Sequence, residues 1–359
     1  MKFALAIVLF IALPQIALGA DVMVRYEHNY WKANSQSTIF PLNRDEQTSQ
    51  VDVQQYYDRG VVSATLEEDR VALKEATYQS SWGNWETTVG KAYLAWDWSY
   101  SRRPLDLFGQ DQSLLPQGQW LAAADWLGAS RTWTVACTSD SETQVGPWQL
   151  RDRFCAIRHY QLIGALEWQG VAFGNEDTWG GGLGFTWVPL DALELHGSLR
   201  GQQEFQFEQA DLSTETQTGG WFGLIGGHWT FNNETQLMVE WHYDQAGWTQ
   251  TDWQNHQDMI AAMPPIPEAL TGFAERLANP YLYRQQVFFR IDKTFDWLHP
   301  EVFGFWQPEM NSATITSQIT IEPDNELSLT AGYKRYLGDL WPHQEGWYAA
   351  VEFELLEEQ

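Results

Sequence analysis

Polar and charged side chains occupy alternate positions in three segments of this chain. They are Glu194, His196 and Arg200 in the first segment, Glu240, His242 and Asp244 in the second, and Arg284, Gln286, Arg290 and Asp292 in the third. Successive side chains of a β-strand point to opposite faces, so each set would share one strand face. Rows of such groups can line a water-filled passage and select ions by charge. We predict these residues as pore-lining candidates; for each, an ordinary wall position without a selective role is the alternative.

Acid–base catalysis is the other chemistry that such residues could perform, and the closest group is His242 with Glu240 and Asp244. Positions two apart on a strand are about 7 Å apart, so we expect no direct hydrogen bond between these side chains. A hydrolase needs a nucleophile, a base and an orienting group within mutual reach. The eight histidines are scattered, and the sequence contains neither a Gly-x-Ser-x-Gly nor a His-Glu-x-x-His motif. We therefore predict no enzyme, no catalytic residue, no cofactor and no metal site.

The elements that would carry these residues are strands, because the apolar pattern repeats every second residue. Leu193, Leu195, Gly197 and Leu199 interleave with polar residues, and residues 236–244, 281–292, 313–321 and 347–355 alternate in the same way. A soluble β-sandwich would alternate too. The predicted strands, however, approach the length of about 9–11 residues that a tilted membrane strand requires.

Two kinds of connection take turns along the chain. Tight turns are predicted at 58–60, 83–84, 128–129, 163–165, 189–192, 232–233 and 323–325, and longer segments such as 98–117 fall between them. Short turns on one rim and long loops on the other are typical of outer-membrane barrels, whose strand number is even. We predict an all-β fold, a closed antiparallel transmembrane β-barrel of about 18 strands, with 16 as the alternative. Every long connection except 293–300 then lies on the outer rim.

The N-terminus has the pattern of a secretory signal. Lys2 precedes the apolar residues 3–13, and small residues surround Gly19 and Ala20, after one of which we expect cleavage. Residues 1–20 are therefore predicted to be a signal peptide and residues 21–359 the barrel; a buried N-terminal helix is the alternative. The chain has no later run of about 18 apolar residues.

Composition narrows the class of protein. Aromatic residues make up 15% of the chain, with 21 Trp, which is typical of side chains at a membrane interface and also of carbohydrate-binding β-proteins. The net charge of -26 excludes nucleic-acid binding as the main function, because phosphate recognition needs a basic surface.

Three features of the long connections stand out. Cys137 and Cys155 are expected to form a disulfide in an exported chain, and closing that loop would contribute about 3 kcal/mol. Within residues 245–280, the longest connection, a short helix is predicted over 268–277. The connection near residue 100 carries a mixed-charge cluster that could reach into the mouth of the barrel, formed by Arg102, Arg103 and Asp106.

Several motifs resemble the porin-like outer-membrane barrels of proteobacteria, including those grouped with alginate-export proteins. They are Val71–Tyr78, Trp82-Gly83-Asn84-Trp85, Val89-Gly90-Lys91, Trp96-Asp97, Arg103–Phe108 and the strand-turn-strand unit Gly181–Leu195. The resemblance covers most of the chain in pattern and specifies architecture, without naming a substrate.

This resemblance implies a bacterial outer-membrane location and passage of small polar solutes. The expected partners are outer-membrane lipid, lipopolysaccharide, the barrel-assembly machinery and small solutes. A dedicated export or uptake barrel with a periplasmic partner, and a loop-plugged barrel that forms no channel, are the alternatives.

Overall fold

The structure is a computed structural model. It describes residues 20–33, 44–67, 70–108, 118–139, 148, 150, 153–209, 213–262, 282–323, 327–338 and 343–355. The predicted signal peptide, apart from Ala20, and the helix predicted over 268–277 lie outside the described residues. No helix in the described ranges is long and apolar enough to cross a membrane.

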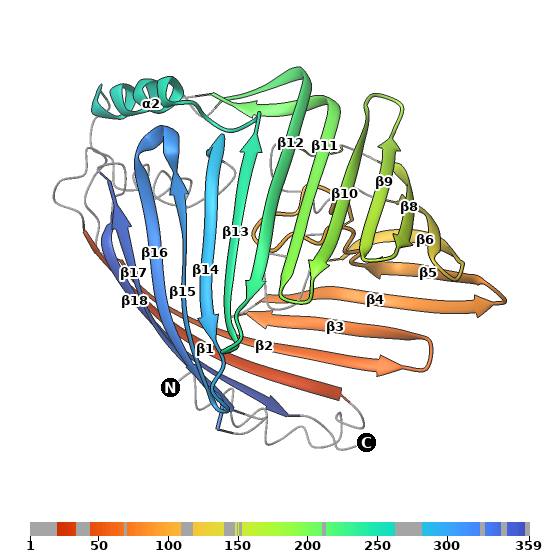
Figure 1. Cartoon of the computed structure of the whole chain (residues 1–359), viewed down its shortest axis with the longest axis horizontal. Helices are drawn as coiled ribbons and strands as arrows, with labels where there is room; N and C mark the ends of the chain where they lie inside the picture. The colour runs from red at the N-terminus through yellow and green to blue at the C-terminus, as the bar shows by residue number, and fades with distance from the viewer. Residues whose placement is uncertain are drawn as a thin grey trace.

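One antiparallel sheet of 18 strands makes up nearly all of the described structure (Figure 1). The strands are β1 (Ala20–Ala33), β2 (Arg44–Tyr57), β3 (Gly60–Glu67), β4 (Arg70–Trp82), β5 (Trp85–Ala92), β6 (Gln119–Leu127), β7 (Arg131–Thr138), β8 (Cys155–Ile163), β9 (Leu166–Gly174), β10 (Trp179–Leu190), β11 (Leu193–Glu208), β12 (Thr214–Thr230), β13 (Thr235–Asp244), β14 (Gln285–Lys293), β15 (Leu298–Gln307), β16 (Ser312–Ile321), β17 (Leu327–Leu337) and β18 (His343–Leu355).

Each strand pairs with the strand that follows it in the sequence, and β1 pairs with both β2 and β18. In the β1–β18 pair, for example, Arg25 lies opposite Glu352 and Asn29 opposite Tyr348. The all-β antiparallel architecture predicted from the alternation is thus confirmed.

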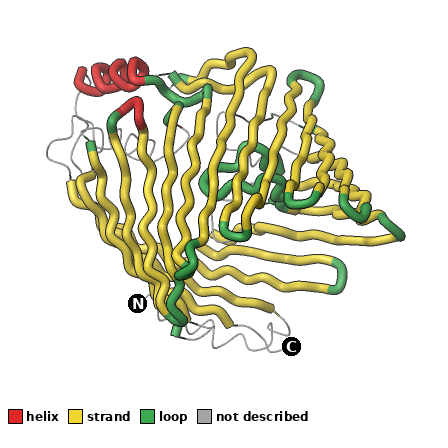
Figure 2. The backbone as a smooth tube through the Cα atoms, viewed as in Figure 1, coloured by secondary structure: helices red, strands yellow, loops and turns green. Residues whose placement is uncertain are grey.

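The connections at the two ends of the strands differ in length. One edge carries short turns, such as 83–84 and 164–165, where Gly83 and Gly164 both have φ of +61°. A positive φ costs glycine little, so these two-residue hairpins are sterically allowed. The opposite edge carries the longer connections, including the one that contains α2 (Gln250–Ala262), and also the short 3-10 helix η2 (Pro308–Met310) (Figure 2). The predicted tight turns are confirmed, except that Asp324 and Asn325 lie outside the described residues.

The prediction of a long connection over 293–300 is wrong. Strand β14 continues to Lys293 and β15 begins at Leu298, so only four residues join them. The hydrogen bonds between Phe295 and Leu298 close this connection as a compact turn on the short-turn edge.

Helix α2 was not predicted, although its N-terminus carries a recognisable signal. The Thr249 hydroxyl accepts a hydrogen bond from the Asp252 backbone N–H, and the Asp252 carboxylate accepts one from the Thr249 N–H at 2.8 Å. This reciprocal capping satisfies backbone groups that the first turn leaves unpaired.

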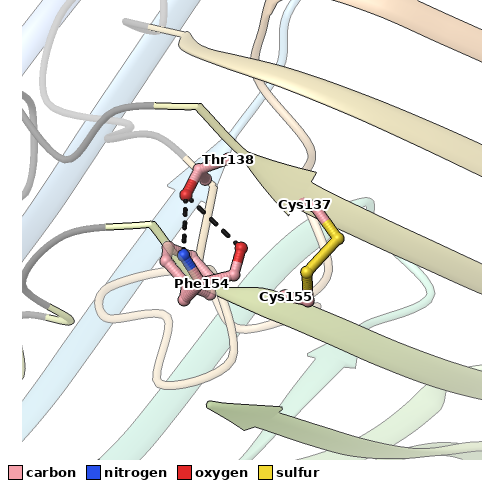
Figure 3. The surroundings of a disulfide bond; sticks show 4 residues. All are labelled: Cys137, Thr138, Phe154 and Cys155. Carbon is pink, nitrogen blue, oxygen red and sulfur yellow. Dashed lines mark hydrogen bonds between the residues drawn. A yellow bond between two sulfur atoms is a disulfide. The ribbon is translucent and has the colours of Figure 1, made fainter. Parts of the chain in front are cut away.

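Cys137 and Cys155 form the predicted disulfide (Figure 3). They lie directly opposite each other in the β7–β8 pair. Beyond them, the Thr138 N–H donates to the Phe154 carbonyl oxygen at 2.9 Å, and the Phe154 N–H donates to the Thr138 hydroxyl at 3.1 Å. The disulfide therefore joins the two ends of the β7–β8 connection at the point where the two strands separate.

The two faces of the sheet differ in polarity. On β13, Val239 and Trp241 point outward and are 43% and 41% exposed, whereas Glu240, His242 and Asp244 point inward and are fully buried. On β10 and β12, Leu183 and Ile225 are exposed on the outer face, and on β9 the polar Gln169 is buried on the inner face. The outer face of these strands is therefore apolar, and the inner face carries buried polar side chains beside an apolar cluster that includes Leu121, Val171 and Phe173.

Candidate functional site: a loop docked on the inner wall

The connection between β5 and β6 folds inward and covers part of the inner face. We call residues 93–108 the inserted loop; it starts and ends at a short antiparallel bridge between Leu94 and Phe108. Leu105 and Phe108 in this loop are completely buried. Leu105 packs over Gly182 of β10, where a β-carbon would overlap its side chain. The absence of a side chain at Gly182 therefore lets the loop approach the strand.

Two aspartates organise the inserted loop from within. The Asp106 carboxylate accepts the backbone N–H groups of Trp96 and Asp97 at 2.7 and 2.8 Å, and the Tyr93 hydroxyl at 2.7 Å. Burial raises the pKa of Asp106 to about 6. Asp97 accepts the N–H groups of Ser99 and Leu105 at 3.0 and 2.8 Å, and burial raises the pKa of this carboxyl too.

Glu240 of β13 is the main anchor between the wall and the inserted loop. Its carboxylate accepts the Tyr100 N–H at 2.9 Å, the Ser101 N–H at 3.0 Å and the Ser101 hydroxyl. The ring of His196 on β11 lies 2.8 Å from the same carboxylate. Hydrogen bonds to a carboxylate are stronger than those between neutral groups, and burial makes their loss costly. Glu240 therefore fixes the position of the 100–101 turn.

His242 extends this anchor. Its Nε2 lies 2.7 Å from the Ser101 hydroxyl and 3.5 Å from a Glu240 oxygen, so the expectation of no direct hydrogen bond between Glu240 and His242 is wrong. The two side chains converge on Ser101 because the loop lies between them and the interior. A serine beside a histidine is also the start of a nucleophile–base pair. Here the serine hydroxyl donates to Glu240, and His242 Nδ1 has no hydrogen-bond partner among the described residues to orient the ring. The contacts fit the docking of a loop.

Asp244 joins a second connection to the inserted loop. One of its oxygens accepts the Trp148 indole N–H at 2.9 Å and the Ala246 N–H at 2.9 Å, and the other lies 3.5 Å from the Arg102 guanidinium. The Trp148 ring stacks on Phe205 of β11 at 5.0 Å, and its carbonyl oxygen accepts a hydrogen bond from Arg200. The disulfide-closed connection and the inserted loop thus meet at one buried carboxylate.

The structure brings together most of the residues predicted to line a pore. The first and second sets, on β11 and β13, converge under the loops, with His196, Arg200, Glu240, His242 and Asp244 buried and Glu194 partly exposed. The third set is divided. Gln286 is buried, Arg290 and Asp292 are partly exposed, and Arg284, just before β14, donates to the carbonyl oxygens of Gly247 and Gln245.

The sequence did not indicate which partners hold these wall residues. Tyr100, Ser101 and Trp148 had no distinguishing pattern, although the neighbouring Arg102, Arg103 and Asp106 had marked this connection as one that could turn inward. Among the described residues, no group of three or more His, Cys, Asp or Glu side chains could hold a metal ion.

Comparison with solved structures identifies the fold. A BenF-like porin from Pseudomonas fluorescens Pf-5 is similar with a TM-score of 0.60 and 10% identity, over 94% of this chain and 98% of that one. OccK2 (OpdF) of Pseudomonas aeruginosa in complex with glucuronate has a TM-score of 0.61 and 11% identity, over 95% and 96%. OpdQ of the same species has a TM-score of 0.61 and 11% identity, over 94% and 97%. The chain therefore has a porin-like fold.

No protein-family model matches the chain, and no curated protein matches its sequence.

Proposed function

We propose that this protein is a porin-like channel of a bacterial outer membrane that passes small polar solutes. In this proposal, residues 1–20 are removed as a signal peptide and the sheet closes through its β1–β18 pairing into an 18-stranded transmembrane barrel. The inserted loop narrows the passage from one side.

The reversed polarity of the sheet is the observation that carries the proposal. Val239 and Trp241 of β13 and Leu183 of β10 (62% exposed) belong to the apolar outer face, while Glu240 and Asp244 of β13 are buried inside. In water such a face would cost about 25 cal/mol for each Å² of exposed apolar surface, whereas lipid tails cover it without that cost. A soluble sandwich has the opposite arrangement.

Exposed aromatic residues at both ends of the strands support the same placement. Those near the short turns are Trp82, Trp85, Trp187, Trp229 and Trp297, and those near the opposite edge are Trp120, Trp179, Trp221, Trp306 and Trp347. Tryptophan is enriched at both membrane–water interfaces, where its ring is apolar and its N–H remains hydrated. The two aromatic bands would mark the boundaries of the hydrocarbon layer.

The strand number and the docked loop support the passage of small solutes. A closed barrel of 18 strands is wide enough for an aqueous channel. The inserted loop packs against the wall from β6 to β13. On β9 Gln169 donates to the Trp96 carbonyl oxygen, and on β13 Glu240 holds the 100–101 turn. The remaining polar wall, from β14 through β1, would line the opening. The likeness to a BenF-like porin supports this use of the fold.

Single-channel recording tests the proposal. The protein, refolded in detergent, should run as a heat-modifiable band and produce steady conductance steps in a planar lipid bilayer. Protein denatured by boiling, added at the same concentration, is the control and should produce none. A folded, heat-modifiable protein that produces no steps would contradict the channel.

A plugged barrel is the second candidate, and the meeting of two connections at Asp244 favours it. In that case the wild-type protein would be silent, and Asp244→Asn, which weakens both attachments, would open a conductance. A channel predicts steps already in the wild type.

A further inference from the structure

Near the short-turn ends of the strands, beside the region that the inserted loop covers, the wall carries a continuous row of polar side chains. We call it the polar belt; it consists of Glu194, His228, Gln236, Asp292, Glu301 and Gln318, one from each strand from β11 to β16. Glu194 lies opposite His228, Gln236 opposite Asp292, Asp292 opposite Glu301 and Glu301 opposite Gln318. The His228 ring bonds the Gln236 side chain at 3.1 Å, which closes the remaining step.

The basic groups next to this belt are outnumbered by carboxylates. Arg290 lies 3.0 Å from Asp292 and 2.7 Å from Glu301, so one guanidinium faces two acids. The pattern repeats farther along the wall, where Arg25 of β1 lies 2.7 Å from Glu27 and 4.0 Å from Glu352. Each group retains one negative charge in excess.

Glu194 adds a further negative charge at the other end of the belt. Its only ion-pair partner among the described residues is the His196 ring, at 3.5 Å. His196 is itself bound to the Glu240 carboxylate at 2.8 Å. Even with His196 protonated, this cluster of two carboxylates and one imidazole remains negative. The sign of the belt therefore does not depend on the protonation of that histidine.

The inserted loop brings passing solutes to this belt. Tyr100, at the tip of the loop, is exposed, and its ring lies 5.5 Å from the His196 ring and 6.1 Å from the His228 ring. The opening beside Tyr100 is thus bordered by the Glu194 end of the belt. An aromatic face next to carboxylates attracts cations through the ring quadrupole and the acidic charge together.

We infer that the opening beside the inserted loop selects small cations over anions of the same size, with Glu194 and the carboxylate excess of the polar belt as the determinants. This inference rests on the proposed channel function. Rings of acidic side chains at a narrow point raise the local concentration of cations and repel anions.

The reversal potential in a potassium chloride gradient tests whether the channel prefers cations to anions. The wild-type protein should pass K⁺ in preference to Cl⁻. Glu194→Gln should lower that permeability ratio by about twofold, since one charge a few ångströms from the path changes the ion energy by a fraction of a kcal/mol in a watery pore. Arg290→Gln should shift the ratio in the opposite direction, because it frees two carboxylates. Glu176→Gln, on the exposed β9–β10 connection, is the matched control and should leave the ratio unchanged.

Solute uptake into liposomes extends the test to a pair of sugars of similar size. Glucosamine, a cation, should enter faster than glucuronate, an anion, and Glu194→Gln should reduce the difference. A preference for chloride in the wild type, or an equal change of the permeability ratio in all three variants, would overturn the inference. The proposed channel function would still stand. A silent bilayer would overturn the channel itself, and the inference with it.

Discussion

Glu240 on β13 accepts a hydrogen bond from the backbone N–H of Tyr100 at 2.9 Å, across 140 positions of sequence. The bond attaches the tip of the inserted loop to the wall, and the Ser101 N–H strengthens the attachment at 3.0 Å. This buried carboxylate holds the tip of the loop, and so the width of the proposed passage beside the tip, in addition to the contacts of Trp96, Arg102 and Leu105 with the wall.

Replacing Glu240 should release the tip of the loop. Glu240→Gln keeps the size of the side chain but removes the charge that receives two backbone N–H groups, so we expect a loss of about 2–3 kcal/mol in docking. In single-channel recordings, the conductance of the variant should be noisier than that of the wild type and should differ from it in size. Glu176→Gln is the control for loss of a carboxylate elsewhere. A quiet conductance equal to the wild type would show that the loop is held by other contacts.

A side chain added at Gly182 on the wall should push the inserted loop away from β10. Gly182→Ala would place a methyl group against Leu105 and 2.6 Å from the Leu199 carbonyl oxygen, and such overpacking typically costs about 1–3 kcal/mol. Gly201→Ala is matched to it on the next strand, because its nearest neighbour would be 3.9 Å away. The temperature at which the folded band converts to the unfolded band should fall for Gly182→Ala only. Equal effects of both substitutions would contradict the packing described.

The docked state of the inserted loop should weaken as the pH rises through about 6. Burial raises the pKa of Asp106 from its ordinary value of 3.8 to about 6, so folding favours its protonated form. This contribution is fully present below pH 4 and is lost as the pH rises through the folded pKa; it amounts to about 3 kcal/mol. Asp97 contributes in the same direction.

Thermal stability measured between pH 4 and pH 8 checks this dependence. The wild type should lose stability between pH 4 and about 6, and Asp106→Asn, which cannot titrate, should lose less over that interval. Identical slopes for the two proteins would show that Asp106 does not titrate in this range.

The Trp148 indole should stabilise the connection after β7 through its N–H as well as through its ring. Trp148→Phe retains stacking on Phe205 but removes the hydrogen bond to Asp244, with an expected loss of about 1.5–3 kcal/mol because the acceptor is charged. Trp148→Ala should cost more, about 3–5 kcal/mol, since it also leaves a cavity. The rate at which a protease cleaves the connection that follows β7 measures the effect of each substitution. Equal sensitivity of Trp148→Phe and the wild type would mean that stacking alone holds the indole.

The strand pattern was predictable because it is local. Alternation over Leu193–Leu199 and Leu237–Tyr243 follows from the two-residue repeat of an extended chain, and a single apolar face forces the register. Turn positions such as Gly83-Asn84 and Gly164-Ala165 are equally local, since they depend on residues that accept a positive φ or end a strand. The disulfide could be predicted because an exported chain reaches an oxidising compartment.

Local patterns in the chain were thus enough to predict an all-β fold, the two faces of the strands and the residues that point inward. Local patterns could not predict that Tyr100 and Ser101 bind Glu240 or that Trp148 and Arg102 share Asp244. Nor could they predict that Glu194, Asp292 and Glu301 lie in one row. A connection such as residues 93–108 has no repeating pattern, and its position depends on contacts between residues far apart in sequence. Those contacts form only when the strands have placed the buried carboxylates together, so no short stretch of sequence records them.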